Sequence, residues 1–375
     1  MIYLDYAANT PADDAVLNSF MLAERELVGN PNSHHPAGEA ARQKLAGVTE
    51  KIAELLGVLP SEIIYTSGAS EANNLAVKGI ALAHSQEGRH ILTTPLAHPS
   101  VRGPLAWLRT QGFEVEMLQV GRGGQIDLAH LKAHLRSDTV LLAVTAVDSE
   151  LGAVQQMSEL IEIIKDFPHC RLHADATQAM GKIPFSLDGL HTASLSAHKF
   201  HGLNGSGLLF RRQGVTLEPL IHGSGGGGGE GLYRSGTPTV ALACALRTAL
   251  ELSLGSLEKH LSHVSRLNHR LREALAAYPL VRFNSPPDAV PHILNLSVAG
   301  TIGTRWQRML GERGVCVSVK SACAADGAPS EAVLAVSGDR RNALSSWRIS
   351  LDHETTDAEL TEFLAVFDQC YRALT

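Results

Sequence analysis

Apolar positions between about residue 49 and residue 210 form short runs, which are separated by longer stretches with helical spacing. The short runs predict strands, and the amphipathic stretches 99–110 and 157–167 predict helices between them. This alternation is typical of an α/β fold in which helices cover a mostly parallel sheet. The predicted strands are 62–66, 90–93, 114–118, 140–147, 171–174, 193–196 and 207–210.

A run of five consecutive glycines, 225–229, interrupts this pattern, and a long helical stretch over 240–277 follows it. On composition alone, such a run is a hinge or a surface loop. Further apolar runs then predict a second, smaller α/β domain. We expect residues 13–254 to form the large domain, and residues 1–12 with 255–375 to form the small one. The strands predicted there are 293–298, 314–319 and 347–351.

The composition mainly excludes classes of partner and of site. Of the 375 residues, 44% are hydrophobic and 19% charged, and the net charge of −6 predicts neither a nucleic-acid nor a membrane partner. The N-terminal residues do not resemble a signal peptide, so we expect a cytoplasmic protein. The 18 histidines contain no H-E-x-x-H pattern, and the spacing predicts no metal site. The five cysteines, odd in number and without C-x-x-C spacing, predict no disulfide framework; they are Cys170, Cys244, Cys316, Cys323 and Cys370.

Candidate chemistry gathers where predicted strands end, which is the edge at which parallel sheets bind ligands. After the strand 62–66 come Ser67–Glu71, small and polar residues that open a helix. Free N–H groups and a serine hydroxyl there can bind a phosphate, although serine also caps ordinary helices. His98 follows the strand 90–93, where a histidine is either a packing residue or a ring that stacks on a ligand.

Two charged residues follow the next strand ends. Asp175 ends an apolar strand, where an aspartate is costly to bury without a cationic partner such as a protonated pyridine nitrogen. Lys199 follows the strand 193–196 and is either a solvated charge or a desolvated amine suited to Schiff-base formation. A phosphate site, a ring-stacking histidine, an aspartate and a lysine are together the groups that hold and activate pyridoxal 5′-phosphate (PLP).

Eight motifs spread over almost the whole chain strengthen this interpretation. They are Tyr3–Pro11, Gly29–Ser33, Thr66–Glu71, His173–Gln178, Ser196–Lys199, Arg234–Thr237, Ser321–Cys323 and Ser346–Ser350. In this order they resemble the cysteine desulfurase family, in the class-V aminotransferase group of PLP-dependent enzymes. The resemblance implies the PLP-dependent transferase fold type I. It also implies conversion of L-cysteine to L-alanine, with transfer of the sulfur to an enzyme cysteine as a persulfide.

The resemblance further implies how the cofactor is held. Lys199 would carry PLP as a Schiff base, and Asp175 would pair with the pyridine nitrogen. Gln178 would hydrogen-bond the ring oxygen, and His98 would stack on the ring and take part in catalysis. The phosphate would be bound by Ala69, Ser70, Ser196, His198 and Thr237.

Thr237 in this family reaches the phosphate of the neighbouring subunit, so the resemblance implies a homodimer. Arg348 would bind the substrate carboxylate, as a planar guanidinium does well, and Asn30 would also contact the substrate. Cys323 matches the sulfur-accepting cysteine, and residues 323–338 resemble the family's long-loop form, in which this cysteine moves between cofactor and acceptor. The acceptor would be a protein that the sequence does not identify.

The residues themselves single out Cys323 as well. It lies among small residues that have little to pack, and nearby Lys320 favours the thiolate. Cys316, inside the strand 314–319, is predicted to be a core residue instead.

Two departures from the family fall in the substrate region. Ser149 stands where the family usually has an asparagine, and the residues around Cys323 differ from the usual Ser-Gly-Ser-Ala-Cys-Thr-Ser. Three alternatives therefore stay open: a PLP-dependent lyase acting on cystine or selenocysteine, a transaminase-like enzyme, and a weakly active partner in a sulfur-transfer assembly.

Overall fold

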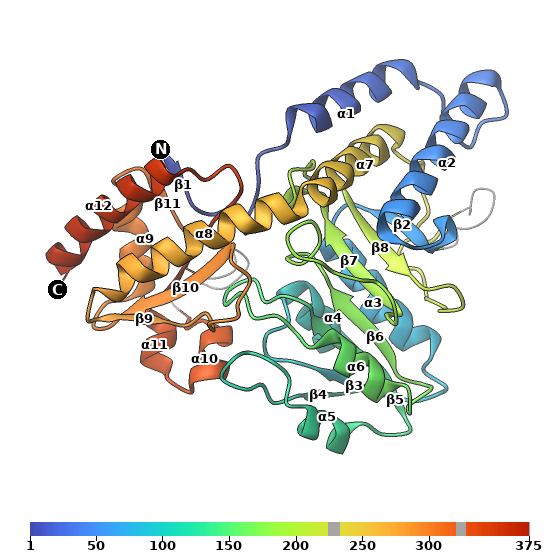
Figure 1. The fold of residues 1–375 in the computed structure, drawn as a ribbon. Helices are drawn as coiled ribbons and strands as arrows, with labels where there is room; N and C mark the ends of the chain where they lie inside the picture. Colours follow the sequence, from blue (N-terminus) through green and yellow to red (C-terminus); the bar gives the residue numbers. More distant parts are fainter. Residues whose placement is uncertain (224–232, 320–327, 375) are drawn as a thin grey trace.

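The computed structural model describes residues 1–223, 233–319 and 328–374. Its helices are α1 (Asp14–Glu26), α2 (Pro36–Leu56), α3 (Ala69–Ala83), α4 (Pro99–Thr110), α5 (Leu128–His134), α6 (Met157–Ile164), α7 (Val240–Gly255), α8 (Leu257–Ala276), α9 (Gly303–Gly311), α10 (Glu331–Ser337), α11 (Arg340–Ser345) and α12 (Asp357–Leu374). Two folded parts lie side by side, and α7 and α8 pass from one to the other (Figure 1).

A seven-stranded sheet forms the centre of the first part. Its strands are β2 (Ile63–Thr66), β3 (His90–Thr93), β4 (Glu114–Met117), β5 (Thr139–Thr145), β6 (Arg171–Asp175), β7 (Thr192–Ser196) and β8 (Gly207–Arg211). Their order is β2-β8-β7-β6-β5-β3-β4, and only β8 runs antiparallel to its neighbours. The predicted strands are therefore confirmed with ends shifted by one or two residues, and so is the mostly parallel sheet.

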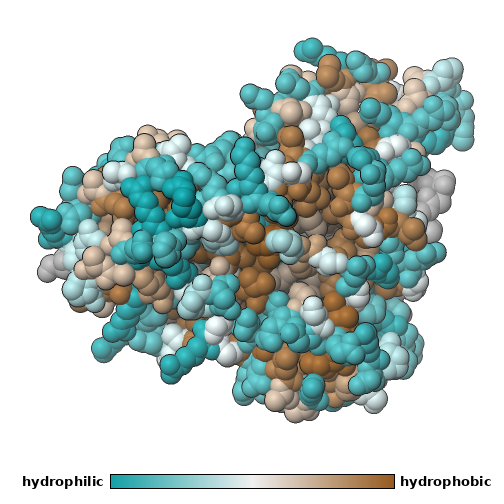
Figure 2. All heavy atoms as spheres, in the orientation of Figure 1, coloured by the Kyte–Doolittle hydropathy of each residue, from teal (hydrophilic) through white to brown (hydrophobic). Residues whose placement is uncertain are grey.

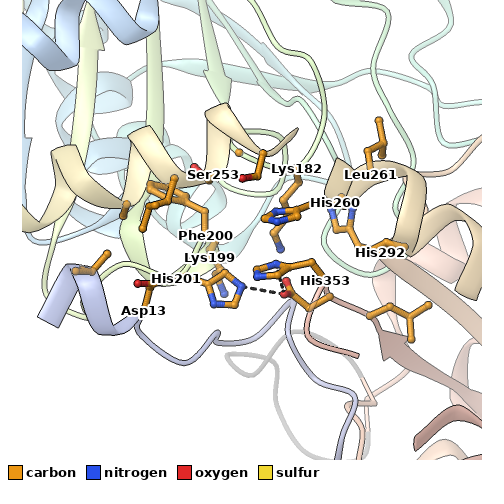
Figure 3. A pocket seen from close by; sticks show the side chains of 18 residues that line it. Asp13, Lys182, Lys199, Phe200, His201, Ser253, His260, Leu261, His292 and His353 are labelled. Carbon is orange, nitrogen blue, oxygen red and sulfur yellow. Dashed lines mark hydrogen bonds and ion pairs between the residues drawn. The ribbon is translucent and has the colours of Figure 1, made fainter. Parts of the chain in front are cut away.

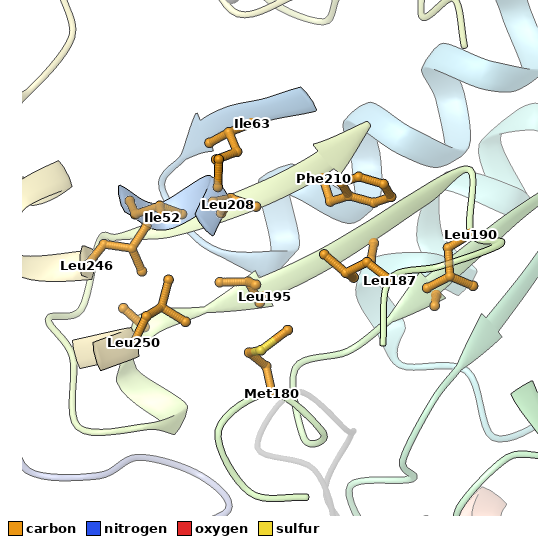
Figure 4. Packing of buried hydrophobic residues seen from close by; sticks show 14 of the residues in the cluster. Ile52, Ile63, Met180, Leu187, Leu190, Leu195, Leu208, Phe210, Leu246 and Leu250 are labelled. Atoms are coloured by element: carbon orange, nitrogen blue, oxygen red, sulfur yellow. The ribbon is translucent and has the colours of Figure 1, made fainter. Parts of the chain in front are cut away.

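Helices cover both faces of this sheet, and the inner strands β3, β5 and β7 are accordingly buried at every position. On one face α3 and α4 pack on residues such as Ile64, Leu141 and Leu209. On the other face α2, α6 and α7 enclose a second cluster, in which Leu195 and Leu208 of the sheet face Ile52 of α2 and Leu246 and Leu250 of α7 (Figure 4). The carboxyl ends of β5, β6 and β7 consequently open toward the second part, where a ligand can enter.

The second part contains a smaller sheet of order β12-β10-β9, all antiparallel. Its strands are β9 (Val281–Phe283), β10 (Ile293–Val298) and β12 (Ser346–Ser350), and β1 (Ile2–Tyr3) pairs separately with β11 (Val315–Cys316). The predicted strand 314–319 is thus shortened to two residues, after which Ser318 forms an isolated bridge with Arg348. The proposed domain division at residues 12 and 254 stays a prediction.

The helical stretch predicted over 240–277 is two helices rather than one, with a bend of 64° between α7 and α8. The bend falls at Gly255 and Ser256, which are weaker helix formers than the residues around them. It lets α7 pack in the core of the first part while α8 packs in the core of the second. In the described chain, no single helix is long and apolar enough to cross a membrane, and this bent pair has the length and composition only when taken together.

Polar side chains cover most of the face seen in Figure 2, and hydrophobic ones gather toward its middle, between the two parts. The core of the second part is aromatic. Trp306 stacks on Trp347 and on Phe367, with ring centroids 5.7 Å and 5.0 Å apart. Because side chains alternate along a strand, Trp347 and Ile349 of β12 point into this core, and Arg348 between them points to the other face.

We predict that Phe367→Ala lowers the free energy of unfolding by about 3–5 kcal/mol, because it removes a fully buried ring that packs against both tryptophans. Guanidinium denaturation followed by tryptophan fluorescence measures the change. Leu22→Ala is the control, since that side chain is 56% exposed and should cost little. Equal stability of the two variants would show that the aromatic stack is not a main support of the second part.

Candidate active site

A cavity of about 270 Å³ lies at the carboxyl ends of β5, β6 and β7. Its position agrees with the rule that open parallel sheets bind ligands at this edge. Nine of the side chains predicted from the sequence line it: Ala69, Ser70, His98, Asp175, Gln178, Ser196, His198, Lys199 and Arg348.

Lys199 lies on a single 3-10 turn, Ala197–Lys199, directly after β7. Its Nζ donates hydrogen bonds to the carbonyl oxygens of Ala7 at 2.8 Å and Ala8 at 2.6 Å. Both carbonyls belong to the N-terminal segment, which leaves β1 and crosses to the cavity. Thr10 fixes this crossing, because its N–H and its hydroxyl both donate to the carbonyl oxygen of His198 at 3.0 Å.

Asp175 is buried at the end of β6, and donors from the protein hold its carboxylate in place. Oδ2 accepts a hydrogen bond from Asn73 Nδ2 at 2.9 Å, and Oδ1 accepts one from the Thr177 N–H at 3.1 Å. Asn73 is itself fixed, because its Oδ1 lies 2.9 Å from His173 Nε2 and also accepts a hydrogen bond from the Ser194 hydroxyl. A carboxylate held by amide and N–H donors is well suited to pair with a protonated ring nitrogen.

His98 caps the N-terminus of α4, where its Nδ1 accepts the Ser100 N–H at 3.1 Å and lies 2.7 Å from the Ser100 hydroxyl. Burial lowers the pKa of His98, and the nearby positive charges of Lys199 and Arg102 lower it further, against the opposing effect of Asp175. This shift of the pKa favours the neutral form of the ring. A neutral imidazole with a fixed orientation can lie flat on an aromatic ligand.

The start of α3 lines the cavity with groups that suit an anion. The N-cap residue Gly68 has no side chain to cap the helix, so donor groups remain at its start, and the Ser70 hydroxyl adds one more. Gly68 has φ 144°, and a side chain on Gly207 would lie 2.4 Å from its Cα, so the close approach of the two strands requires glycine. The Ser196 hydroxyl accepts the Ala69 N–H at 2.7 Å.

Two further side chains that line this cavity are those of His198, which is neutral, and Gln178, which is held by hydrogen bonds. Burial lowers the pKa of His198 to about 4, with Lys199 and Lys182 adding to the effect. Gln178 is held from both ends, because its Nε2 donates to the Ala7 carbonyl at 2.8 Å and its Oε1 accepts from Lys182 at 3.1 Å.

Arg348 reaches the cavity from β12 and forms an ion pair with Asp5, Nη2 to Oδ1 at 2.7 Å. Its Nη1 donates to the Ser149 carbonyl oxygen at 2.7 Å, and its buried Nε has no hydrogen-bond partner among the described residues. The other oxygen of Asp5 accepts the Ser318 hydroxyl at 2.7 Å. Asp5 thus connects Arg348 to the last residues before the segment that carries Cys323.

Three predicted site residues are not found at this cavity. Asn30 and Thr237 lie together elsewhere, with Nδ2 and Oγ1 3.4 Å apart. Cys323 and the glycine run 225–229 lie outside the described residues. Cys316 is in β11 as predicted, but it is only partly buried and so is not the core residue we expected.

Sequence reasoning missed Asn73, Ser100 and Asp5, which hold Asp175, His98 and Arg348. Asp5 lies within the motif Tyr3–Pro11, so the resemblance pointed to its segment but not to its role. Asn73 lies one turn into a helix and Ser100 just after a cap, where neither type of residue stands out in a sequence.

These groups fit PLP. Helix donors and hydroxyls at Gly68–Ser70 suit its phosphate, the Asp175 carboxylate suits its ring nitrogen, and the neutral His98 ring suits its face. The Lys199 amine lines the same cavity and can make the covalent link.

Comparisons with known proteins agree with this geometry. A profile of the aminotransferase class-V family matches residues 2–363. A protein of Dictyoglomus turgidum named cysteine desulfurase IscS is 36% identical over 100% of this chain and 95% of its own length. A NifS/IcsS protein homolog of Lactobacillus delbrueckii subsp. bulgaricus is 35% identical over 99% of this chain and 97% of its own length.

Solved structures show the same likeness. One described as a NifS-like protein superposes with a TM-score of 0.93 at 34% identity, covering 100% of both chains. Another, described as SspA in complex with cysteine, has a TM-score of 0.82 at 30% identity and covers 95% of this chain and 100% of its own. The family profile and these relatives match nearly the whole chain, and its fold and cavity agree with them. The chain therefore belongs to the cysteine desulfurase family of the class-V aminotransferases.

Proposed function

We propose that the protein binds PLP at Lys199 and converts L-cysteine to L-alanine, leaving the sulfur on Cys323 as a persulfide. The observation that carries the proposal is the convergence of the Lys199 amine, the Asp175 carboxylate and the neutral His98 ring on one cavity. A cytoplasmic location, a homodimer and a separate protein as sulfur acceptor belong to the same proposal.

When bound, PLP supplies an electron sink for the electrons of the substrate's Cα–H bond. Asp175, held by Asn73, keeps the ring nitrogen protonated by charge pairing. His98 would stack on the ring and keep water from that face. The Lys199 amine would take the Cα proton of the substrate and later return a proton as alanine forms.

Arg348 is the group that binds the substrate carboxylate in this proposal. Arg348 is buried, and its ion pair with Asp5 leaves part of the guanidinium available. Its Nε has no hydrogen-bond acceptor among the described residues. An unpaired buried donor is costly, so an anion that satisfies it is bound favourably. The Ser149 carbonyl oxygen holds the guanidinium from the other side, and so Ser149 supports this site through its backbone although its side chain is short.

The described residues on either side of Cys323 support its part in the reaction. Ser318 exchanges two backbone hydrogen bonds with Arg348, and Ser330 donates its hydroxyl to Glu150, next to Ser149. Both anchors belong to the cavity wall or adjoin it. Four residues lie between Ser318 and Cys323, and the five steps of chain reach at most about 18 Å, so we propose that the thiol reaches a substrate held at Arg348.

The covalent link is tested by reducing the PLP-loaded protein with borohydride and mapping the modified peptide. We expect PLP on Lys199 in the wild type and none in Lys199→Ala, with loss of the absorbance band near roughly 400–430 nm. Lys182→Met is the matched control, because Lys182 is the other lysine near the site, through Gln178. Labelling of a lysine other than Lys199 would refute the cofactor assignment.

The sulfur step is tested by measuring alanine released from L-cysteine with and without dithiothreitol. Cys323→Ser should still bind PLP and substrate, but alanine formation should fall to background because a hydroxyl does not form the nucleophilic anion. Cys316→Ser is the control and should keep its turnover. Dithiothreitol should accelerate the wild type by clearing the persulfide, and mass spectrometry should find one added sulfur atom on Cys323.

Turnover of Cys323→Ser at the wild-type rate would contradict this reading. If pyruvate were then the product, sulfur would be leaving by elimination, as in the lyase alternative.

The shared site is tested through Thr237, which is absent from the cavity of its own chain. We expect a homodimer in sedimentation, and Thr237→Ala should weaken PLP retention by about 1.5–3 kcal/mol through loss of one hydrogen bond to a charged phosphate. Thr248→Ala is the control, since the Thr248 hydroxyl bonds to Ser19, Arg247 and the Cys244 carbonyl and does not line the cavity. A fully active monomer would exclude the shared site.

A further inference from the structure

A second cavity, of about 190 Å³, lies beside the first and shares Lys199 in its lining. Figure 3 shows four histidines around it, from the turn after Lys199, from α8, from the segment before β10 and from the residues after β12. They are His201, His260, His292 and His353. The proposed function uses none of them.

Three of the potential ligands converge on one point. His201 Nε2 lies 2.9 Å and His353 Nδ1 lies 2.7 Å from the same oxygen, Oδ1 of Asp352. The ligand atoms of these three residues all lie within 4.8 Å of one another. His201 and Asp352 are 151 residues apart in the chain, so no short sequence motif contains both. For this reason our sequence analysis predicted no metal site.

Two neighbouring histidines support this arrangement: one fixes a ligand ring, and the other places a further imidazole nitrogen in the cavity. His260 stacks on His353 with ring centroids 3.8 Å apart and planes within 2° of parallel, so it fixes the direction of the His353 ring. His292 is 5% exposed, and its Nε2 has no hydrogen-bond partner among the described residues. A buried imidazole nitrogen without a partner is costly, and its presence in this cavity points to a bound ligand.

We infer that His201, Asp352 and His353 form a binding site for a divalent transition-metal ion of the Zn²⁺ type. Two imidazole nitrogens and one carboxylate oxygen are the ligand set of open zinc sites, which leave further positions for water. The adjoining cavity provides room for those positions. On binding, the ion replaces the protons that the two imidazoles share with Asp352, and these protons pass to solvent.

The charges nearby allow such an ion. The Asp352 carboxylate offsets half of its charge. Burial lowers the pKa of Lys182, in the same cavity, to about 7, so this amine is partly neutral at pH 7 and opposes the ion less than an ordinary lysine would. The inference does not rest on the proposed function, because none of the three ligands takes part in it.

The test uses PLP-loaded protein in a Cys323→Ser background, so that this thiolate does not add a ligand, with Zn²⁺ alone as the probe. Calorimetric titration should give one ion per chain, and Zn²⁺ should raise the melting temperature. Asp352→Asn and His353→Gln should each weaken binding more than about 100-fold, and His260→Gln, which removes only the stacked ring, by about tenfold. Bound Co²⁺ should show the visible spectrum of a four- or five-coordinate site.

The matched control is His134→Gln in α5. His130 and His134 also stack, 3.8 Å apart, but no third ligand joins them in the part of the chain that the structure describes. Melting without metal verifies that each variant is folded. Zn²⁺ binding that survives in both Asp352→Asn and His353→Gln, or that is lost in His134→Gln, or that is absent from the parent protein, would overturn the inference.

Discussion

The site depends on the way a partly buried amine obtains its hydrogen bonds. Lys199 leaves the end of β7 inside a cavity, and its Nζ finds acceptors in the carbonyl oxygens of Ala7 and Ala8. Those carbonyls are available only because β1 pairs with β11, which sends the following residues across the gap between the two parts. The N-terminal segment is therefore a wall of the site, and Thr10 closes it by binding the carbonyl next to Lys199.

Each charged side chain at the cavity has a partner that sets its direction. Asn73 holds Asp175, and Asp5 holds Arg348. Leaving a buried charged group without its partner is costly, so these partners contribute to the fold as well as to the chemistry. The cavity keeps two groups that the protein alone does not fully satisfy: the start of α3, where Ser196 accepts the Ala69 N–H but the N-cap Gly68 has no side chain, and the Nε of Arg348. An anionic phosphate and a carboxylate would satisfy them.

The sequence predicted well whatever depends on local pattern. Strand ends, the helix Pro99–Thr110 and the residues Asp175 and Lys199 follow from apolar periodicity and from the rule for ligand binding in parallel sheets. It missed features that depend on three-dimensional packing: the bend at Ser256, where the chain passes from one core to another, and the support that Asn73 gives to Asp175. Contacts between distant residues, such as His201 with Asp352, leave no local pattern to detect.

On the proposed function, Asp5 also couples the two halves of the reaction. One of its oxygens binds Arg348 and the other binds Ser318, which precedes the segment that carries Cys323. A substrate carboxylate at Arg348 offsets the same positive charge that holds Asp5, so binding it weakens the hold of Asp5 on Arg348 and alters the anchor of that segment. On this proposal the substrate carboxylate and the anchor at Ser318 are linked through one carboxylate, that of Asp5.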